Sequence, residues 1–308
     1  MKTPKWFLHK GLIACALLPL SLFYWCVSRV IYKLRARRAY VSRRKIICVG
    51  NILAGGVGKT PIVRQIAKAL DAPVVMRGYK KSAKTGNVGD EALMLARAGL
   101  NVHTGSRHSN IILLNKQKSK TPVVMDDGFQ NPSIKKDLSI IVVDEGFGFG
   151  NGFLLPAGPM REGLDALVRA DAIIVVRAVG VKKKELKLPE NIPVFYADNK
   201  TISPYDDDVP VVAFAGIGYP QKFFAQLKNV VKKVSFPDHY QYNRNDIKKL
   251  MEMADKYDAK LVTTEKDWVR LPMDVRDKIK YAGLETVIDK KFFVWLKEKL
   301  NGNVQEKN

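Results

Sequence analysis

Residues 45–60 read KIICVGNILAGGVGKT, and no other segment says more about the fold class. Residues 45–49 form a short apolar run typical of a buried strand, and Pro61 to Leu70 follow in helical period. A strand, a Gly-rich loop and a helix are the parts of a P-loop. In a P-loop the backbone N–H groups wrap phosphates, a Lys reaches the terminal phosphates, and a hydroxyl group holds Mg²⁺.

The strict P-loop pattern G-x-x-x-x-G-K-[ST] is not met, because Leu53 stands in place of its first Gly. Gly55 and Gly56 can supply the backbone freedom instead. The alternative is a Gly-rich turn that merely precedes Lys-Thr. On the first interpretation, ATP is bound by Leu53, Ala54, Gly55, Gly56, Val57, Gly58, Lys59 and Thr60.

Strand-like and helical segments alternate after this loop. Strands are expected near residues 74–76, 102–104, 123–126, 140–144, 173–177 and 194–196. Such alternation favours an α/β fold: a P-loop NTPase-type parallel sheet with helices on both faces. Asp126 and Asp127 end an apolar strand, where a carboxylate would hold Mg²⁺ directly or through water. A capped turn after the strand is the alternative.

A polar tract at residues 197–208 is typical of a linker. Beyond it, strands are expected near 211–215, 231–235 and 261–264, with helices near 221–229, 246–257 and 292–300. These elements predict a smaller second α/β domain. The expected organisation is therefore an N-terminal apolar helix at 1–28, a P-loop domain at 29–197 and the smaller domain at 198–308, with the linker near 198–209.

The charge of the chain is strongly basic and unevenly spread. Lys and Arg number 52 against 30 Asp and Glu, a formal charge of +22, and no acidic residue precedes Asp71. Such a balance favours a polyanion or an anionic lipid surface as partner. The three cysteines have neither zinc-site spacing nor a disulfide framework, which favours a reducing compartment for the globular part.

The run from Gly11 to Ser28 carries no charge and contains Pro19. It is at the lower length limit for a membrane-spanning helix. Three interpretations of the run are open: a cleaved signal peptide, a buried core helix, or a membrane anchor that either spans the bilayer or lies in its interface. The basic residues after the run favour the anchor, with the globular part of the chain on the cytoplasmic side. They are Arg29, Lys33, Arg35, Arg37, Arg38, Arg43, Arg44 and Lys45.

Several motifs occur in a fixed order along the chain, from LLPLS (17–21) to TTEKD (263–267). Between them lie GN-x-x-x-GG-x-GKTP (50–61), RGY (77–79), GDE (89–91), DDGFQ (126–130), FGNGFLLPAGPMRE (149–162), FAGIG (214–218) and FPDH (236–239). This series resembles the tetraacyldisaccharide 4′-kinase family of lipid A biosynthesis. The resemblance implies transfer of the ATP γ-phosphate to the 4′-hydroxyl of an acylated glucosamine disaccharide 1-phosphate. It also implies anchorage at the cytoplasmic face of the bacterial inner membrane.

The resemblance further implies site residues. The catalytic pair of the family maps to Asp90 and His239, a carboxylate that accepts the hydroxyl proton and an imidazole that orients it. The implied Mg²⁺ environment is Thr60, Asp126, Asp127 and Glu91. The residues implied to contact the substrate are Arg77, Tyr79, Arg107, Gln130 and Arg161. The sequence departs from the family pattern at Met76, Asn131 and Tyr219 and in a short loop between Tyr79 and Gly89, and of these Asn131 and the loop bear on the substrate contacts.

Two other function classes remain open. A P-loop ATPase that drives a membrane partner needs the P-loop and the aspartate pair but no acceptor-activating pair. A nucleic-acid-binding protein would fit the charge, but the sequence contains no recognition motif of that class, so no nucleic-acid partner is expected. The sequence also gives no indication of an obligate protein partner.

Overall fold

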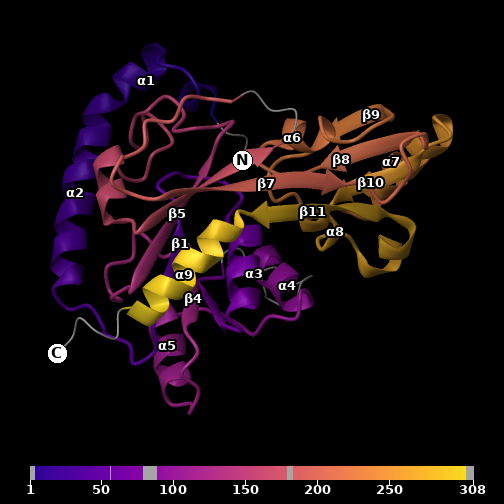
Figure 1. Cartoon of the computed structure of the whole chain (residues 1–308). Coiled ribbons are helices and arrows are strands. Elements are labelled where there is room, and N and C mark those ends of the chain that lie inside the picture. Colours follow the sequence, from indigo (N-terminus) through magenta and orange to yellow (C-terminus); the bar gives the residue numbers. More distant parts are fainter. Residues whose placement is uncertain (1–3, 56, 79–88, 179–182, 303–308) are drawn as a thin grey trace.

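A single mixed sheet of 11 strands organises the chain, in the order β3-β2-β4-β1-β5-β6-β7-β11-β10-β8-β9. The computed structural model describes residues 4–302 except Gly56, 79–88 and 179–182 (Figure 1). The strands are β1 Ile46–Gly50, β2 Val74–Met76, β3 Val102–Thr104, β4 Val123–Asp126, β5 Leu138–Asp144, β6 Ala172–Ala178, β7 Val194–Ile202, β8 Val211–Ala215, β9 Val230–Ser235, β10 Lys260–Thr264 and β11 Lys280–Ile288.

Helices and short 3₁₀ segments connect these strands. The α-helices are α1 Leu12–Ala16, α2 Leu18–Ala36, α3 Lys59–Ala69, α4 Asp90–Arg97, α5 Arg107–Asn115, α6 Pro220–Phe224, α7 Arg244–Lys256, α8 Glu265–Trp268 and α9 Lys290–Gly302. The 3₁₀ segments are η1 Lys5–Phe7, η3 Leu164–Arg169 and η4 Met273–Lys278.

The strands around β1 form the core of the N-terminal half. β1 pairs in parallel with β4 on one side and β5 on the other, and every residue of β1 and β4 is buried. Strands buried along their whole length are covered on both faces, which is why they read as continuous apolar runs. The expected parallel α/β sheet is therefore confirmed for this half.

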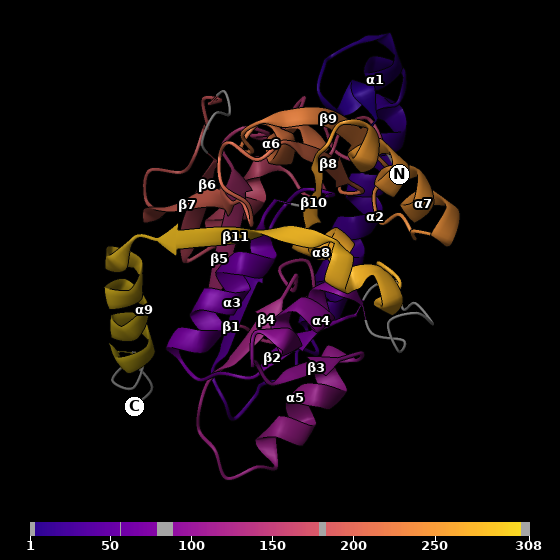
Figure 2. The same ribbon diagram turned by 90° about the vertical axis from the view of Figure 1, so that its right-hand side faces the viewer.

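The second group of strands joins the same sheet through one antiparallel pair. Among the described strands, only β7 and β11 run antiparallel, with Gly283 opposite Ile202 and Ile288 opposite Ala197. β7 continues to Ile202, so the first residues of the tract predicted as a linker are strand residues. In Figure 2, β11 crosses the molecule with β2, β3 and β4 on one side and β8, β9 and β10 on the other. β11 was absent from the sequence prediction.

Helix α3 begins directly after the Gly-rich loop. Gly58 adopts a left-handed conformation with φ +80°, which favours glycine, and Lys59 is the first helical residue. Ile62, Val63, Ile66 and Ala67 recur at helical spacing and are buried in the core next to β1 and β4. Full burial of each isoleucine contributes about 1.5–3 kcal/mol.

The apolar N-terminal run is divided between α1 and α2. α2 starts at Leu18 with Pro19 in its first turn and lies along one side of the molecule (Figure 1). Ser21 Oγ donates to Leu154 O at 2.9 Å, and Tyr24 Oη donates to Arg161 O at 3.1 Å, so this face of α2 is attached to the body. Other side chains of the helix, including Phe23 and Leu22, are exposed. Across the described ranges, no helix is both long and apolar enough to cross a bilayer.

Arg44 differs from its expected role in the basic flank. Its side chain is buried, donates to Thr121 O at 2.6 Å and to Leu114 O at 3.3 Å, and so fastens α5 to the start of β1. It is therefore not available to an external anion.

Candidate active site

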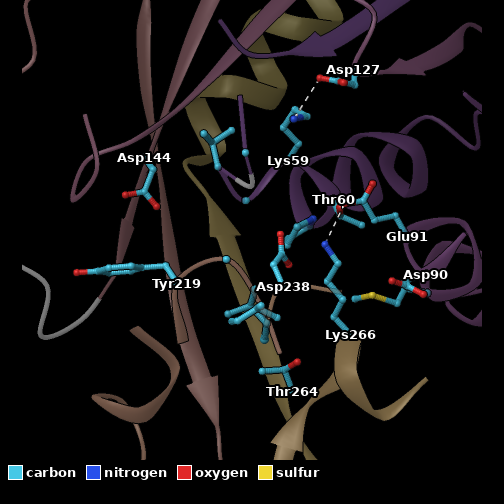
Figure 3. A pocket seen from close by; sticks show the side chains of 18 of the residues that line it. Lys59, Thr60, Asp90, Glu91, Asp127, Asp144, Tyr219, Asp238, Thr264 and Lys266 are labelled. Carbon is cyan, nitrogen blue, oxygen red and sulfur yellow. Dashed lines mark hydrogen bonds and ion pairs between the residues drawn. The ribbon is translucent and has the colours of Figure 1, made fainter. Parts of the chain in front are cut away.

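A cavity of about 740 Å³ lies where the two groups of strands meet. Its lining comes from the loop before α3, the start of α4, the ends of β4 and β5, and the segments that surround β8 and β10. Figure 3 shows Lys59, Asp127, Glu91 and Asp90 from the N-terminal half facing Tyr219, Asp238, Thr264 and Lys266 from the C-terminal half. Most of the sequence-predicted site residues that the structure describes line this cavity.

The Gly-rich loop is hydrogen-bonded to the segment that follows Leu155. Ala54 N donates to Pro159 O and Arg161 N donates to Ile52 O, both at 2.7 Å. Leu53, which replaces the first P-loop glycine, is buried and forms a bridge with Met160. At position 53 the loop is therefore fixed by apolar packing and does not use the conformational freedom of a glycine. Gly56 lies outside the described residues, whereas Leu53, Ala54, Gly55, Val57, Gly58, Lys59 and Thr60 line the cavity.

Lys59 lies over the end of β4. Its Nζ atom is 3.2 Å from Asp127 Oδ1 and donates to Asn51 Oδ1 at 3.3 Å. Arg161 also pairs with Asp127, with Nη1 at 3.1 Å from Oδ2. Burial would raise the pKa of Asp127, but Lys59 and Arg161 outweigh it and hold that pKa below its usual value. Asp127 is therefore a carboxylate already neutralised by two cations.

Asp126 is the opposite case. Its Oδ1 atom is buried without a hydrogen-bond partner among the described residues. Burial raises its pKa to about 7, Lys59 lowers it, and Glu91 and Asp127 raise it further. A buried carboxylate with an unpaired oxygen is a group that a cation would complete.

Two buried donors lie near these aspartates. Arg107 Nη2 donates to the backbone oxygens of Asp126 and Asp127 at 2.9 and 3.0 Å, whereas its Nε atom has no partner in the described part of the chain. Asn51 Nδ2 is also buried and unpaired there. Unpaired donors cost free energy unless a ligand satisfies them, and Arg107 also lines the cavity. These atoms fit an anionic group at the start of α3.

The other predicted contacts are divided. Arg77 lines the cavity, and Glu91 does so while pairing with Lys266 Nζ at 3.3 Å. Gln130 is not among the lining residues, because its amide donates to Asn51 O at 2.7 Å and to Glu162 Oε2 at 3.1 Å. It supports the loop rather than facing a ligand. Tyr79 lies outside the described residues.

The predicted metal environment is not a closed cage. The described residues contain no group of three or more His, Cys, Asp or Glu side chains that could hold a metal ion by themselves. Mg²⁺ is commonly bound by one or two carboxylates together with substrate phosphates and water. The unpaired oxygen of Asp126 fits that kind of site.

Asp90 and His239 meet across the cavity although 149 residues separate them. Asp90 begins α4, and its Oδ2 atom lies 3.2 Å from His239 Nδ1. His239 has φ +60°, a left-handed conformation that costs about 1–2 kcal/mol outside glycine. Such strain is typical of functional positions. Burial would raise the pKa of Asp90, but the His239 hydrogen bond and the Arg270 charge outweigh it, so the pKa is lowered.

The sequence prediction omitted three residues that the structure brings to this site. Arg270 donates from Nε to Asp90 Oδ2 at 2.8 Å. Lys222 Nζ lies 2.5 Å from both carboxyl oxygens of Asp144 and joins α6 to the end of β5. A carboxylate at the end of a parallel strand was the available signal for Asp144. No local signal marks Arg270 or Lys222, because their partners are distant in the sequence.

The sequence matches the model of a known protein family over most of its length. The family described as tetraacyldisaccharide-1-P 4′-kinase (LpxK) matches residues 13–301. A protein named tetraacyldisaccharide 4′-kinase from Paramagnetospirillum magneticum is 39% identical over 304 residues, 91% of this chain and 92% of that protein. A relative of the same name from Hyphomonas neptunium is 38% identical, over 85% of this chain and 84% of its own length.

A solved structure shows the same fold. The crystal structure of LpxK from Aquifex aeolicus in complex with ATP superposes with a TM-score of 0.72 at 24% identity, and the match covers 94% of this chain and 99% of that one. The fold agreement and the sequence similarity extend over nearly the whole chain. The chain therefore belongs to the tetraacyldisaccharide-1-P 4′-kinase family.

Proposed function

We propose that the protein transfers the γ-phosphate of ATP to the 4′-hydroxyl of tetraacyldisaccharide 1-phosphate, which gives lipid IVA in lipid A biosynthesis. The observation that carries this proposal is the similarity to tetraacyldisaccharide 4′-kinases over most of both chains. The cavity supports it, because basic and acidic groups suited to phosphate transfer and a carboxylate–imidazole pair all line it.

The phosphates of ATP are bound at the start of α3. Lys59 leaves Asp127 in part and pairs with the terminal phosphates, while the backbone of residues 53–58 donates hydrogen bonds. Arg107 and Arg161 lie close enough to Asp126 and Asp127 to offset part of the negative charge of these carboxylates. Thr60, Asp126 and Asp127, with Glu91 at the rim, would hold Mg²⁺, which neutralises charge on the β- and γ-phosphates. The buried, unpaired oxygen of Asp126 supports that assignment.

Asp90 and His239 activate the acceptor. The 4′-hydroxyl oxygen attacks the γ-phosphorus and its proton passes to Asp90. The bond from the γ-phosphorus to the bridging oxygen breaks, and ADP leaves with the electron pair on that oxygen. His239 keeps the carboxylate in place. The lowered pKa of Asp90 keeps it ionised and able to accept a proton at neutral pH.

The body of the enzyme lies at the cytoplasmic face of the bacterial inner membrane. Leu20, Leu22, Phe23, Val30 and Leu34 leave a long apolar strip of α2 exposed. Exposed apolar strips on a helix flanked by basic residues are typical of interfacial membrane binding. We infer that α2 lies in the headgroup region, with the basic residues after it toward anionic lipid. We propose that residues 1–28 are the membrane-binding segment, 29–197 the kinase domain and 198–308 a smaller domain, although α2 continues to Ala36 and β7 crosses the second boundary.

A direct assay tests the proposal. Detergent-solubilised protein is incubated with labelled ATP, Mg²⁺ and the disaccharide 1-phosphate, and the expected product is a bis-phosphorylated lipid. ATP hydrolysis without acceptor, unaffected by Asp90→Ala, would instead favour an ATPase.

A further inference from the structure

Arg270 is the most deeply buried cation near the cavity. Its side chain is 0% exposed and lies just after α8, in the C-terminal half. A guanidinium group never loses its proton in a protein and can only donate hydrogen bonds, so burial of this group demands several acceptors.

The guanidinium divides its donors between its own half and the opposite one. Nη1 donates to Gly216 O at 2.9 Å and to Asp267 Oδ1 at 3.0 Å. Nε donates to Asp90 Oδ2 at 2.8 Å, and Nη2 lies 3.2 Å from His239 Nδ1. Asp267 already supplies a buried counter-charge from the same half. Charge balance within the C-terminal half therefore does not require the contacts that Arg270 makes with Asp90 and His239, the proposed catalytic pair.

The two oxygens of Asp90 are treated differently. Oδ2 accepts from Arg270 and contacts His239, whereas Oδ1 has no hydrogen-bond partner among the described residues. Asp90 lines the cavity and is 8% exposed. One oxygen is thus fixed from behind, and the other is left for a group that enters the cavity.

The backbone around Arg270 is built to permit this approach. Gly216 O accepts from both Arg270 Nη1 and His239 N, the latter at 3.0 Å. A Cβ atom on Gly216 would lie 3.0 Å from Asp267 Oδ1 and 3.1 Å from Pro237 O. Glycine is therefore needed for Arg270, Asp267 and His239 to converge, which accounts for one glycine of the FAGIG motif.

We propose that Arg270 is a positioning residue for acceptor activation: its guanidinium holds Oδ2 of Asp90 beside Nδ1 of His239 and leaves Oδ1 of Asp90 to take the acceptor proton. This inference rests on the proposed function. Arg270 acts through Asp90 and does not touch the substrate. During transfer the new bond forms between the acceptor oxygen and the γ-phosphorus, the proton moves to Oδ1, and the bridging oxygen leaves with ADP.

The contacts at His239 Nδ1 add a constraint. The contact with Arg270 is a hydrogen bond only if Nδ1 carries no proton, and the contact with Asp90 is one only if it does. Both cannot exist at once. Arg270 therefore holds Asp90 whichever proton position the imidazole has, which makes it the permanent support of the carboxylate.

The test compares Arg270→Gln and Arg270→Lys with a matched control, Arg276→Gln, in the full-length protein in detergent. Arg276 supports the same turn through Val269 O at 2.8 Å and Leu271 O at 3.1 Å but does not contact Asp90. The measurements are kcat for lipid phosphorylation, the affinity for ATP and the melting temperature. R270Q is expected to lose roughly 10–100-fold in kcat with ATP affinity unchanged, less than the roughly 10²–10⁴-fold typical of losing a general base, because Asp90 itself is still present. R270K should regain much of this loss while remaining a few-fold below wild type, and R276Q should keep a near-native kcat.

A double variant separates positioning from a merely structural role. If Arg270 acts through Asp90, then Asp90→Ala combined with Arg270→Gln should be as active as Asp90→Ala alone within about threefold. Should R270Q fail to fold, the same comparison is made with R270K, whose deficit must vanish in the Asp90→Ala background. Three outcomes would overturn the inference while lipid phosphorylation by the wild type stands. They are multiplicative losses of kcat in the double variant, a native kcat in R270Q, and a kcat in R270K that is no higher than in R270Q. A wild type that makes no bis-phosphorylated lipid overturns the proposed function and this role together.

Discussion

Replacement of Asp126 by Asn should make the stability of the protein less dependent on pH while abolishing its activity. Burial, with contributions from Glu91 and Asp127 against that of Lys59, raises the pKa of this carboxyl group from 3.8 to about 7 in the folded chain. The folded state therefore holds the proton more tightly than the unfolded state. The stabilisation is full below the unfolded pKa of 3.8 and is lost as the pH rises toward about 7.

The size of the effect follows from the shift. From 3.8 to about 7 is about 3 pKa units, which corresponds to about 4 kcal/mol of unfolding free energy in total. Between about pH 5 and about pH 8 the portion lost is about 3 kcal/mol. An Asn side chain has no such titration, so Asp126→Asn should lack this part of the decline. The same change removes a proposed Mg²⁺ ligand, so kinase activity should fall to near background.

Equilibrium urea unfolding at several pH values, in EDTA and without ATP, measures the effect. Asp255→Asn, at an exposed carboxylate of α7, is the control and should follow the wild type. Addition of Mg²⁺ and ATP should stabilise the wild type more than Asp126→Asn. Equal pH dependence in wild type and Asp126→Asn would refute the reasoning, because Asp126 would then not be a strained carboxylate that a cation relieves.

Three further sets of substitutions test other parts of the protein. Lys59→Ala should nearly abolish turnover through loss of phosphate contacts, measured with labelled ATP, and near-native activity would exclude this loop as the ATP site. Asp90→Ala and His239→Ala should each lower kcat by roughly 10²–10⁴-fold, and the double variant should be little worse than the poorer single one if they act as a unit. Independent, multiplicative losses would point to separate roles. Leu22→Glu with Phe23→Glu should reduce binding to anionic vesicles in flotation assays without a change in melting temperature, because both side chains are exposed on α2. Undiminished vesicle binding would contradict the interfacial assignment.

The strands of the N-terminal half could be predicted because burial on both faces leaves a simple trace. β1 and β4 are buried at every position, so their sequences are apolar runs bounded by turns. β11 was missed because it is not buried along its whole length. Its residues alternate irregularly between buried and exposed, it includes Gly283 and Glu285, and it pairs with β7 only after a long excursion of the chain. Neither periodicity nor composition marks such a strand.

Residue types at the site were easier to predict than their arrangement. Lys59, Asp126 and Asp127 lie at positions fixed by strand–loop–helix geometry, so the sequence could place them together, and all three line the cavity. The partners that tune them could not be placed. Arg161 neutralises Asp127 from a segment that also supports the Gly-rich loop, and Arg270 reaches Asp90 from 180 residues away. Such contacts depend on tertiary packing, which leaves no local pattern.

The position of β11 in the sheet determines how the two groups of strands are joined. β11 lies between β7 and β10, so the ladder that carries β8, β9 and β10 has no hydrogen-bonded link to the first strands until β11 is in place. Pairings so distant in sequence slow folding, because their loops must close before any contact stabilises them. We therefore expect the part of the cavity that carries Arg270 and His239 to reach its final position late in folding.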